Sequence, residues 1–523
     1  MSENILIRSV NWIGDAVMTI PTIRLIKNTF RDSRISLLVR PQVKAVFDGN
    51  PFIDEFILYE DRHRSLLGRL NLVSQLRKRQ FSKAFLFQNA FDAALITFLA
   101  RIPERIGYNR DGRGFLLTGP IPFNNDDRKI HHIDYYLNLV RYYTGKKGSR
   151  VQGSKGSFDS LNPRIPDSLY IFLSLEERSS MRGRLKGLKR PILGINPGAT
   201  YGSAKRWLTD RFAEVAEWFI KDTGGSVIIT GSAAECSIAD EIVKTIDPEL
   251  RSSGYVINLS GKTSLRELIN LISECDLYLS NDSGPMHVAY AVGTPLVAIF
   301  GSTDPKLTGP VGEGAKVIKA EVDCGPCFNR SCDRDRMCMY GIDSDDVYLA
   351  LRSFLPTRRA VFFDRDGTIC KDVDYLRRWE DLKVFNDIDS INLLKDKGFL
   401  LIGITNQSGI GRGLIEEGFV KKVNRFFIDE YGFHDFFYCP HLPSEHCSCR
   451  KPQLGMIHRA RVRHNIDLRG SYVIGDKDDD MLLALAAGAK GIFVRTGKEQ
   501  SSPNAVKIVG NLREAVNFII RDS

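Results

Sequence analysis

The sequence predicts an α/β protein built on parallel sheets, and three observations carry this prediction. Short apolar runs, among them ILIRSV, PILGIN and PLVAIF, recur along the chain, and helix-like stretches separate them. This alternation is typical of βαβ units. The 523 residues are enough for about three domains. Hydrophobic residues make up 43% and charged residues 26% of the chain, ordinary values that exclude disorder, collagen and coiled coil as the main structure.

The predicted elements fall into three groups along the chain. ILIRSV, ISLLV and KAFLF are expected strands of the first group, with a helix over Ala16–Thr29, and PILGIN, SVIIT, DLYLS and PLVAIF are strands of the second. Segment 145–168 is rich in Gly, Ser, Lys and Pro, which is typical of a linker. A helix-like stretch ends before Pro356, and the strand AVFFD begins at Ala360. We therefore expect Rossmann-like domains at 1–165 and 166–356, and a separate Rossmann-like α/β domain at 357–523.

The overall charge and the termini restrict the environment of the protein. No apolar run approaches the ~20 residues that span a bilayer, and Arg8 interrupts Ile5–Ile7 too early for a signal peptide. A cytoplasmic location follows, in which the ten cysteines remain thiols or metal ligands. The net charge of +10 fits a solvated basic surface or attraction to a nucleotide-sugar or an anionic membrane. Nucleic acid is not expected, because no basic stripe is interleaved with aromatics.

The first predicted domain begins with a glycine turn between a strand and a helix, VNWIGDAVMTIPTI. Asp15 lies at this turn, where the helix N-terminus stabilises a carboxylate. A cleft-facing carboxylate and a simple N-cap remain equally open interpretations. In the second domain, Gly198 and Gly202 of INPGATYGSAKRW permit close backbone approach, and Lys205 offers a positive charge to a diphosphate.

A second polar turn follows a strand in LSNDSGPMHVAYAVGTP. Asp282 and Ser283 can cap a helix whose free N–H groups point at an anion. His287 lies in the first turn of that helix, where it can bind a ligand or serve a structural role. Glu235 follows a further strand in TGSAAE.

Together these segments resemble the heptosyltransferases of lipopolysaccharide core synthesis, type II more than type I, over about Met1–Pro356. The motifs are GDAVMTIPTI, NPGA, AKRW, LSGKTSL and NDSGPMHVA. The resemblance implies a GT-B glycosyltransferase of family 9, an ADP-heptose donor, and a lipid A-core acceptor at the inner membrane surface, where the enzyme would be peripheral. It implies inverting displacement without a metal, with Asp15 as general base. It implies donor contacts from Lys205, Glu235, Asp282, Ser283, Gly284 and His287.

Four cysteines close the second domain in the spacing C-x2-C-x4-C-x5-C, at Cys324, Cys327, Cys332 and Cys338. Similar cysteines occur in many relatives of this family. Metal binding and reduced thiols in a packed loop both remain open for them.

The third domain begins with acids at a predicted strand end, AVFFDRDGTI. Asp364 and Asp366 then lie at the carboxyl edge of the sheet, where open α/β folds bind ligands. One carboxylate can attack phosphorus and form an aspartyl phosphate. Mg²⁺ can offset the repulsion between carboxylate and phosphate. The second carboxyl group can protonate the leaving oxygen and later deprotonate water.

Three further pieces follow in order. Thr405 and Asn406 end the strand of FLLIGITNQSG and can hold phosphate oxygens. Lys451 of CRKP supplies a point charge for phosphate. Asp476 and Asp480 of SYVIGDKDDD offer the oxygen ligands that Mg²⁺ prefers.

These pieces resemble the haloacid dehalogenase (HAD) superfamily of phosphatases over Arg358–Ser523. The resemblance implies Asp364 as nucleophile and Asp366 as acid and base. It implies that Thr405, Asn406, Arg450 and Lys451 bind phosphate, and that Asp364, Asp366 and Asp476 form the magnesium site.

A cysteine- and histidine-rich loop precedes RKP. Cys439, His441, Cys447 and Cys449 have the spacing C-x-H-x5-C-x-C, and three thiolates with one imidazole suit tetrahedral Zn²⁺. Free cytosolic thiols beside a solvated histidine are the alternative. A zinc ion here would hold the loop that carries Lys451, which is a structural role.

A loop of this kind is similar to those of two phosphatases, which act on D-glycero-D-manno-heptose 1,7-bisphosphate and on histidinol phosphate. TNQSGIGRG (405–413) and VRTGK (494–498) are similar to the heptose type, which implies that Arg412 meets the second phosphate or the sugar. The five-residue gap between His441 and Cys447 is shorter than in many members.

The two resemblances predict a bifunctional enzyme of heptose metabolism, with Mg²⁺ and Zn²⁺ in its phosphatase part. Two alternatives remain: a histidinol-phosphate phosphatase in the C-terminal part, or a non-catalytic scaffold in the N-terminal part. The sequence leaves open the anomer preferred by the phosphatase, the acceptor structure, the oligomeric state and the interdomain geometry.

Overall fold

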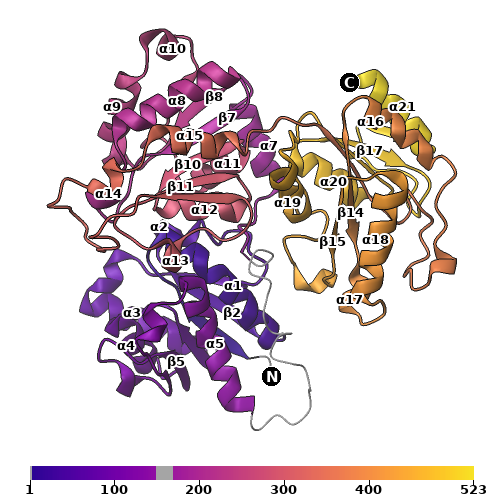
Figure 1. The fold of residues 1–523 in the computed structure, drawn as a ribbon. Coiled ribbons are helices and arrows are strands. Elements are labelled where there is room, and N and C mark those ends of the chain that lie inside the picture. The colour runs from indigo at the N-terminus through magenta and orange to yellow at the C-terminus, as the bar shows by residue number, and fades with distance from the viewer. Residues whose placement is uncertain (1–2, 149–168) are drawn as a thin grey trace. The chain divides into compact units, whose positions relative to one another are not determined.

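The computed structural model describes residues 3–148 and 169–523, and the chain divides into two compact units, Met1–Leu351 and Arg352–Ser523 (Figure 1). Within the described residues, the first unit contains two six-stranded sheets and the second unit contains one. Every pair of neighbouring strands in them is parallel. The predicted α/β class with parallel sheets is confirmed.

The three sheets share one strand order. The orders are β3-β2-β1-β4-β5-β6, β12-β11-β10-β7-β8-β9 and β15-β14-β13-β16-β17-β18, and each is the doubly wound order 3-2-1-4-5-6 of Rossmann folds. The strands are β1 (Asn4–Arg8), β2 (Arg34–Val39), β3 (Glu55–Leu58), β4 (Lys83–Leu86), β5 (Glu104–Tyr108), β6 (Gly119–Ile121), β7 (Ile192–Asn196), β8 (Ser226–Ile229), β9 (Val256–Asn258), β10 (Leu277–Asn281), β11 (Leu296–Phe300), β12 (Ala315–Lys319), β13 (Ala360–Phe363), β14 (Leu400–Asn406), β15 (Asp435–Cys439), β16 (Tyr472–Gly475), β17 (Lys490–Val494) and β18 (Lys507–Val509).

The central strands are buried because helices cover both faces of each parallel sheet. Every residue of β7, β10 and β13 is buried. The helices of the first unit are α1 (Ile13–Thr29), α2 (Pro41–Lys44), α3 (Leu66–Lys78), α4 (Phe91–Leu99), α5 (His132–Gly148), α7 (Leu175–Arg184), α8 (Thr209–Thr223), α9 (Cys236–Thr245), α10 (Pro248–Ser252), α11 (Leu265–Glu274), α12 (Gly284–Val292), α13 (Pro305–Thr308), α14 (Met337–Tyr340) and α15 (Ser344–Arg352). Those of the second unit are α16 (Asn392–Asp396), α17 (Ser408–Gly411), α18 (Glu417–Tyr431), α19 (Gly455–His464), α20 (Asp478–Ala487) and α21 (Leu512–Asp522).

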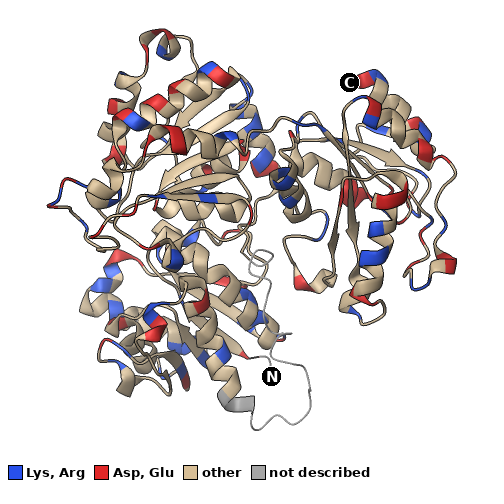
Figure 2. Ribbon diagram, viewed as in Figure 1, with Lys and Arg blue, Asp and Glu red and all other residues tan. Residues whose placement is uncertain are grey.

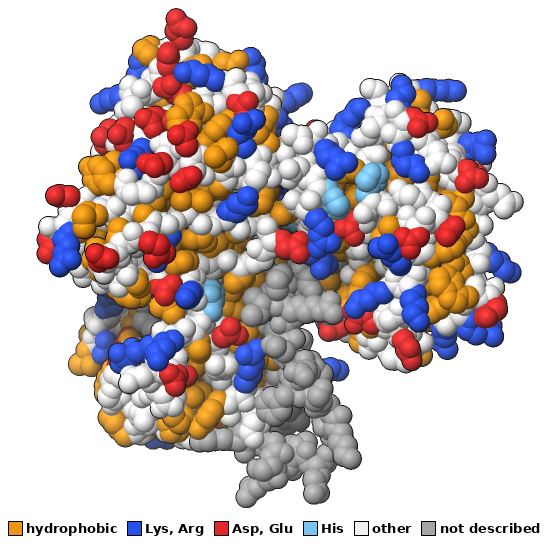
Figure 3. All heavy atoms as spheres, viewed as in Figure 1, with side chains coloured by type: hydrophobic (Ala, Val, Ile, Leu, Met, Phe, Trp, Pro, Cys, Tyr) orange, Lys and Arg blue, Asp and Glu red, His pale blue; other side chains and the backbone are white. Residues whose placement is uncertain are grey.

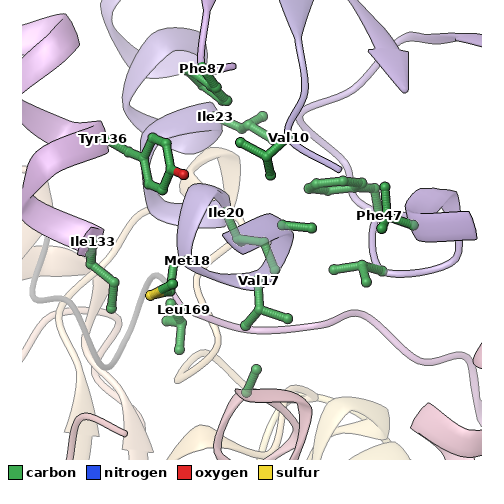
Figure 4. Packing of buried hydrophobic residues seen from close by; sticks show 14 of the residues in the cluster. Val10, Val17, Met18, Ile20, Ile23, Phe47, Phe87, Ile133, Tyr136 and Leu169 are labelled. Atoms are coloured by element: carbon green, nitrogen blue, oxygen red, sulfur yellow. The ribbon is translucent and has the colours of Figure 1, made fainter. Parts of the chain in front are cut away.

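Helix α1 joins the two sheets of the first unit. It packs against α5 beside the first sheet and against α12 of the second. One apolar cluster includes Val17 and Met18 of α1 together with Met286 and Val288 of α12, and Figure 4 shows the α1 side of this packing. The second unit has its own core, in which Val361 and Phe363 of β13 are fully buried.

The predicted linker at 145–168 begins too early. Helix α5 continues through Gly148, although its last residues, TGKKG, have the composition of a loop. The remainder of that segment, 149–168, lies outside the described residues. The division between the two units falls at Leu351, close to the predicted boundary at Pro356. Among the described residues, no helix combines the length and apolar character needed to cross a membrane.

Candidate active sites

The strand order places three sites at comparable points of three sheets. In a doubly wound sheet, ligands bind at the carboxyl ends of the two central strands, where the strand order reverses. Asp15 follows β1 in the first sheet, and Asp282 follows β10 in the second. In the third sheet, Asp364 follows β13 and Asp476 follows β16, and these two strands are direct neighbours.

In the second unit, three buried carboxylates meet at this edge. Asp364, Asp476 and Asp480 each place a ligand atom within 4.8 Å of the others. Lys451 Nζ lies 2.8 Å from Asp364 Oδ1 and 2.6 Å from Asp480 Oδ1. Burial alone would lower the pKa of Lys451, but these two carboxylates raise it above its usual range. The lysine is therefore a charged partner of the acids.

Lys451, even with the nearby Lys477, does not neutralise three carboxylates. Burial, together with the nearby Asp364, raises the pKa of Asp476 to about 7. Burial also raises the pKa of Asp480 to about 6, although Lys451 opposes this. The site therefore has an excess of buried negative charge.

The surroundings of Asp476 fit a cation. Its Oδ2 is buried and has no hydrogen-bond partner among the described residues. A Cβ atom at Gly367 would lie 2.4 Å from this oxygen, and one at Gly497 would lie 1.8 Å from it. The two glycines thus leave space beside an unpaired carboxylate oxygen, and an all-oxygen donor set suits Mg²⁺.

The Asp366 side chain lies apart from this carboxylate group. Arg365 donates from Nε to Asp366 Oδ1 at 3.1 Å and from Nη2 to Oδ2 at 2.9 Å. Gln407 Nε2 donates to the same Oδ2 at 2.7 Å and to Thr405 Oγ1 at 2.8 Å. Burial alone would raise the pKa of Asp366, but the Arg365 guanidinium lowers it. The predicted magnesium ligand Asp366 therefore directs its carboxylate to Arg365 and Gln407.

Sequence reasoning missed Arg365 and Gln407. Arg365 is almost fully buried, and its Nη1 also donates to Asn424 Oδ1 at 3.1 Å. Its position between two aspartates at a strand end was a usable signal, because a buried arginine requires acidic or polar partners. Gln407 directly follows the predicted Thr405 and Asn406.

The predicted phosphate-binding residues are placed differently from one another. Thr405 is buried at the end of β14. Asn406 Oδ1 accepts a hydrogen bond from the Lys451 backbone N–H at 3.0 Å, which fixes the lysine beside β14. Arg450 has a buried Nη1 for which residues 3–148 and 169–523 supply no hydrogen-bond partner. Arg412 is exposed directly after α17.

A cavity of about 50 Å³ opens beside Asp366 and is also lined by Asp372, Asp374, Asn406 and Gln407. Two basic side chains lie at its acidic residues. Lys477 Nζ is 3.5 Å and Lys498 Nζ is 3.9 Å from Asp372 Oδ2. Lys498 belongs to the predicted VRTGK segment, which the structure thereby brings to this pocket.

The four predicted zinc ligands form a compact cluster at the end of β15 and in the loop that follows it. Cys439 Sγ is 3.4 Å from Cys447 Sγ and 3.6 Å from His441 Nδ1. Cys449 Sγ is 3.4 Å from Cys447 Sγ and 3.2 Å from His441 Nδ1. Tetrahedral Zn²⁺ with ordinary bond lengths requires ligand separations of about 3.6–3.8 Å. The donor set therefore fits zinc with small adjustments.

In the first unit, Asp15 is in the first turn of α1 but does not cap it. Trp12 is the N-cap residue. The Tyr136 hydroxyl of α5 donates to Asp15 Oδ1 at 3.4 Å, and His132 Nδ1 lies 3.6 Å from the same oxygen. The partly exposed carboxylate therefore faces α5, and the N-cap interpretation does not describe its side chain.

Lys205 and Asp282 form an ion pair after β7 and β10. Lys205 Nζ is 2.5 Å from Asp282 Oδ2, and Thr303 Oγ1 donates to the same oxygen at 2.6 Å. The ammonium group also lies 4.6 Å from the centre of the Tyr201 ring. The structure thus brings the two predicted donor contacts together, with Thr303 as an additional neighbour that sequence reasoning missed.

His287 lies where the two sheets of the first unit meet. It is buried in α12, and its Nδ1 is 3.0 Å from the Tyr290 hydroxyl. Burial lowers the pKa of His287 to about 4, so its imidazole is neutral at pH 7. A Cβ atom at Gly14 would lie 2.6 Å from His287 Cδ2. The glycine of the GDAV motif therefore permits α1 to pack on this ring.

The remaining predicted donor contacts lie around the same strand ends. Ser283 is the N-cap residue of α12, and Gly284 is its first residue. The Ser283 hydroxyl accepts from Asn196 Nδ2 at 3.3 Å. Glu235 accepts from the Ser232 backbone N–H at 2.8 Å. A Cβ at Gly198 would lie 2.1 Å from Glu235 Oε1, so Glu235 packs directly against the NPGA loop.

The four cysteines of the second domain do not form a compact ligand group. Within the described residues, the metal-ligating atoms that gather within 4.8 Å are those of the two groups above. Burial raises the pKa of Cys338, and the neighbouring thiols of Cys332, Cys324 and Cys327 add to this shift. The four cysteine side chains therefore lie near one another, but their sulfur atoms are not arranged as the ligands of a tetrahedral metal ion.

Known proteins match both units. Residues 69–337 match glycosyltransferase family 9 (heptosyltransferase), and residues 448–515 match the HAD-hydrolase-like family. Lipopolysaccharide heptosyltransferase 2 of Salmonella typhimurium is 31% identical over 318 residues, which are 60% of this chain and 87% of that protein. D-glycero-beta-D-manno-heptose-1,7-bisphosphate 7-phosphatase of Haemophilus ducreyi is 40% identical over 179 residues, 31% of this chain and 98% of that protein.

A solved structure agrees with the first of these matches. The E. coli ADP-heptose lipopolysaccharide heptosyltransferase II has a TM-score of 0.56 at 25% identity, over 68% of this chain and 98% of that one. The predicted resemblance to heptosyltransferases of type II, with their GT-B arrangement, and to heptose bisphosphate phosphatases is confirmed. The chain therefore belongs to glycosyltransferase family 9 through its first unit, and its second unit is a HAD phosphatase of the heptose bisphosphate family.

Proposed function

We propose that the chain is a bifunctional enzyme of lipopolysaccharide heptose metabolism. Its first unit transfers heptose from ADP-heptose to a lipid A-core acceptor, and its second unit hydrolyses the 7-phosphate of D-glycero-D-manno-heptose 1,7-bisphosphate. The observation that carries this proposal is the position of the Asp364 group and of Asp282 at the switch points of their sheets, in regions similar to the two enzyme families. A cytoplasmic location is supported by the ten cysteines, none of which is paired in a disulfide.

In the phosphatase reaction, a carboxylate oxygen of Asp364 attacks phosphorus, and the bond from phosphorus to the sugar oxygen breaks. Asp366 gives a proton to that oxygen, and then takes one from the water that hydrolyses the aspartyl phosphate. Arg365 and Gln407 orient Asp366 for both steps. Lys451 binds a phosphate oxygen while it remains paired with Asp364.

Magnesium fits the second unit at Asp364, Asp476 and Asp480, with Asp366 in the adjoining turn. When bound there, Mg²⁺ supplies charge that offsets the repulsion between carboxylates and phosphate. Zinc fits Cys439, His441, Cys447 and Cys449. Cys439 ends β15, and the other three ligands lie between this strand and the Lys451 turn. We therefore assign zinc a structural role in positioning Lys451, and the neighbouring Arg450 with it.

In the transfer reaction, Asp15 takes the proton of the acceptor hydroxyl, whose oxygen attacks the anomeric carbon of the donor. The bond from that carbon to the ADP oxygen breaks. Lys205 and the free N–H groups at the start of α12, beside Ser283 and Gly284, meet the negative charge of the departing diphosphate. Neutral His287 with the nearby Asp282, and Glu235 against the NPGA loop, complete the donor side.

Two assays on the purified chain test this proposal. Phosphate release is measured with heptose 1,7-bisphosphate of either anomer, and histidinol phosphate serves as the competing substrate. Heptosyl transfer is measured with ADP-heptose and a lipid A-core acceptor. We expect both activities, with Asp364→Asn abolishing only phosphate release. Preference for histidinol phosphate would refute the phosphatase assignment, and absence of transfer by a folded chain that binds ADP-heptose would leave the first unit a scaffold.

A further inference from the structure

Helix α3 in the first unit exposes leucines at its N-terminal end. Leu66 is 72%, Leu67 is 80% and Leu70 is 50% exposed. Their helix does have a core-facing side, because Leu72, Val73 and Leu76 in its second half are buried in an apolar cluster with β4. The first turns of α3 therefore carry apolar side chains that the fold does not use.

Two elements next to α3 also expose apolar side chains. Helix α4 contacts both α3 and the short helix η2 (Gly114–Leu116). Phe115 of η2 is 76% exposed, and its ring lies 6.1 Å from that of the half-exposed Phe91 of α4. We call Leu66, Leu67, Leu70, Phe91 and Phe115 the α3 surface. Exposed apolar groups gathered in this way mark an interaction site.

The charge around the α3 surface is positive. Residues 60–79 contain six Lys and Arg and two Asp and Glu, and Figure 2 shows basic stretches along this part of the first domain. Arg62 pairs with Glu60, Arg64 with Asp61 and Arg79 with Glu55, so the surplus comes from the three residues Arg69, Arg77 and Lys78. Figure 3 shows hydrophobic and basic side chains side by side over the α3–α4 region. Exposed leucines with a basic border are complementary to an anionic lipid interface.

The α3 surface also lies near the acceptor side of the first domain. Phe91 is the first residue of α4, and α4 follows β4 in the chain. Strand β4 pairs directly with β1, and Asp15 lies in the helix that follows β1. A bilayer that contacts this surface is thus close to the edge of the sheet that holds the proposed base. We propose that the α3 surface docks the protein on an anionic bilayer, with Leu66 and Leu67 entering the interface. The link to a lipid-borne acceptor rests on the proposed function, whereas docking itself does not.

Vesicle binding of the full chain tests the proposal. Sedimentation with vesicles of phosphatidylcholine containing a third of phosphatidylglycerol is compared with pure phosphatidylcholine vesicles. We expect binding to the anionic vesicles only, and loss of binding in high salt. Leu66→Ser/Leu67→Ser should reduce the partition coefficient roughly tenfold, because two leucines no longer enter the interface. Arg62→Gln/Arg64→Gln should reduce it about fivefold per charge removed.

The matched control replaces exposed leucines elsewhere. Leu349→Ser/Leu393→Ser removes two exposed leucines, which are 60% and 48% accessible, and should bind vesicles like the unchanged chain. The melting transitions of both units, compared with those of the unchanged chain, confirm that each variant is folded. Equal binding by the α3 variant and the unchanged chain overturns the proposal, as does failure of the unchanged chain to bind. Self-association that depends on Leu66 and Leu67, without vesicle binding, shows that the surface joins two copies instead. None of these outcomes depends on heptosyl transfer, so the docking proposal and the proposed function can fail separately.

Discussion

The Asp366 carboxylate accepts two hydrogen bonds from Arg365, one from Gln407 and a longer one, at 3.8 Å, from the Cys370 thiol. A general acid that must later act as a base needs a fixed orientation, and side chains that hold it contribute to turnover without binding substrate. Arg365 also lowers the pKa of Asp366, which favours the ionised form that takes a proton from water in the second step. A substitution of Gln407 therefore disturbs the orientation of the Asp366 carboxylate and leaves its pairing with Arg365 in place.

We expect Gln407→Ala to lower the phosphatase kcat about tenfold, the loss of one charge-assisted hydrogen bond. KM should stay nearly constant, because Gln407 is assigned no substrate contact. Gln407→Glu should lose more, since it places a carboxylate against Asp366. Steady-state kinetics with melting temperatures provide the check, and an increase in KM at unchanged kcat would show that Gln407 binds substrate instead.

Asp15 is the second residue for which a catalytic role can be distinguished from a contribution to protein stability. Its side chain interacts with Tyr136 and His132 rather than with the first turn of its own helix. We expect Asp15→Asn to cut heptosyl transfer by roughly 10²–10⁴-fold, the usual range for removal of a general base. ADP-heptose affinity should change little, because the donor contacts are assigned to the second domain. Near-normal transfer by a stable variant would contradict the assignment.

At the scale of elements, the contact of α1 with α12 gives the first unit a pH-dependent stability. His287 is buried at this contact with a pKa of about 4, below the unfolded value of about 6.5. The unfolded chain therefore binds a proton that the folded chain does not, so stability is complete above pH 6.5 and falls as pH drops toward 4. The full loss is about 3 kcal/mol.

The variant His287→Gln should be less sensitive to pH over this window. We expect its stability to fall less than that of the unchanged chain between pH 7 and pH 4.5, although it is less stable at pH 7. Urea unfolding at several pH values measures the difference. Parallel pH dependence of the two proteins would place the titrating groups elsewhere.

The sequence pattern predicted the position of site residues well where polar side chains directly follow a buried strand. Asp364 and Asp476 could be placed together because both follow buried strands, and the carboxyl ends of neighbouring parallel strands share one edge. The contact of Asp15 with Tyr136 could not be predicted, because the two residues are 121 positions apart and meet only through packing of α5 on α1. The end of α5 was missed because TGKKG lacks apolar periodicity, although the helix continues through Gly148.

At the scale of the whole molecule, the two units have separate apolar cores. Buried residues of the first unit cluster around its two sheets, whereas those of the second unit surround β13 and β14. The four proposed zinc ligands lie within the second unit. Nothing in this division requires the two reactions to share an intermediate, and covalent linkage fixes their ratio at one to one.

Separate cores predict separate responses to ligands. Structural zinc stabilises only the unit that binds it, so a strong chelator should lower the melting temperature of the second unit and leave that of the first. ADP at about a hundred times its dissociation constant should stabilise only the first unit, by about 2.7 kcal/mol. Differential scanning calorimetry of the full chain should therefore show two transitions that move independently.

In Cys447→Ser/Cys449→Ser the zinc content should fall from about one ion per chain to none, whereas Cys324→Ser/Cys327→Ser should retain it. Zinc retained by the first variant and lost by the second would place the ion among the cysteines of the first unit. In the calorimetry, a single transition that responds to both the chelator and ADP would show that the two units unfold as one.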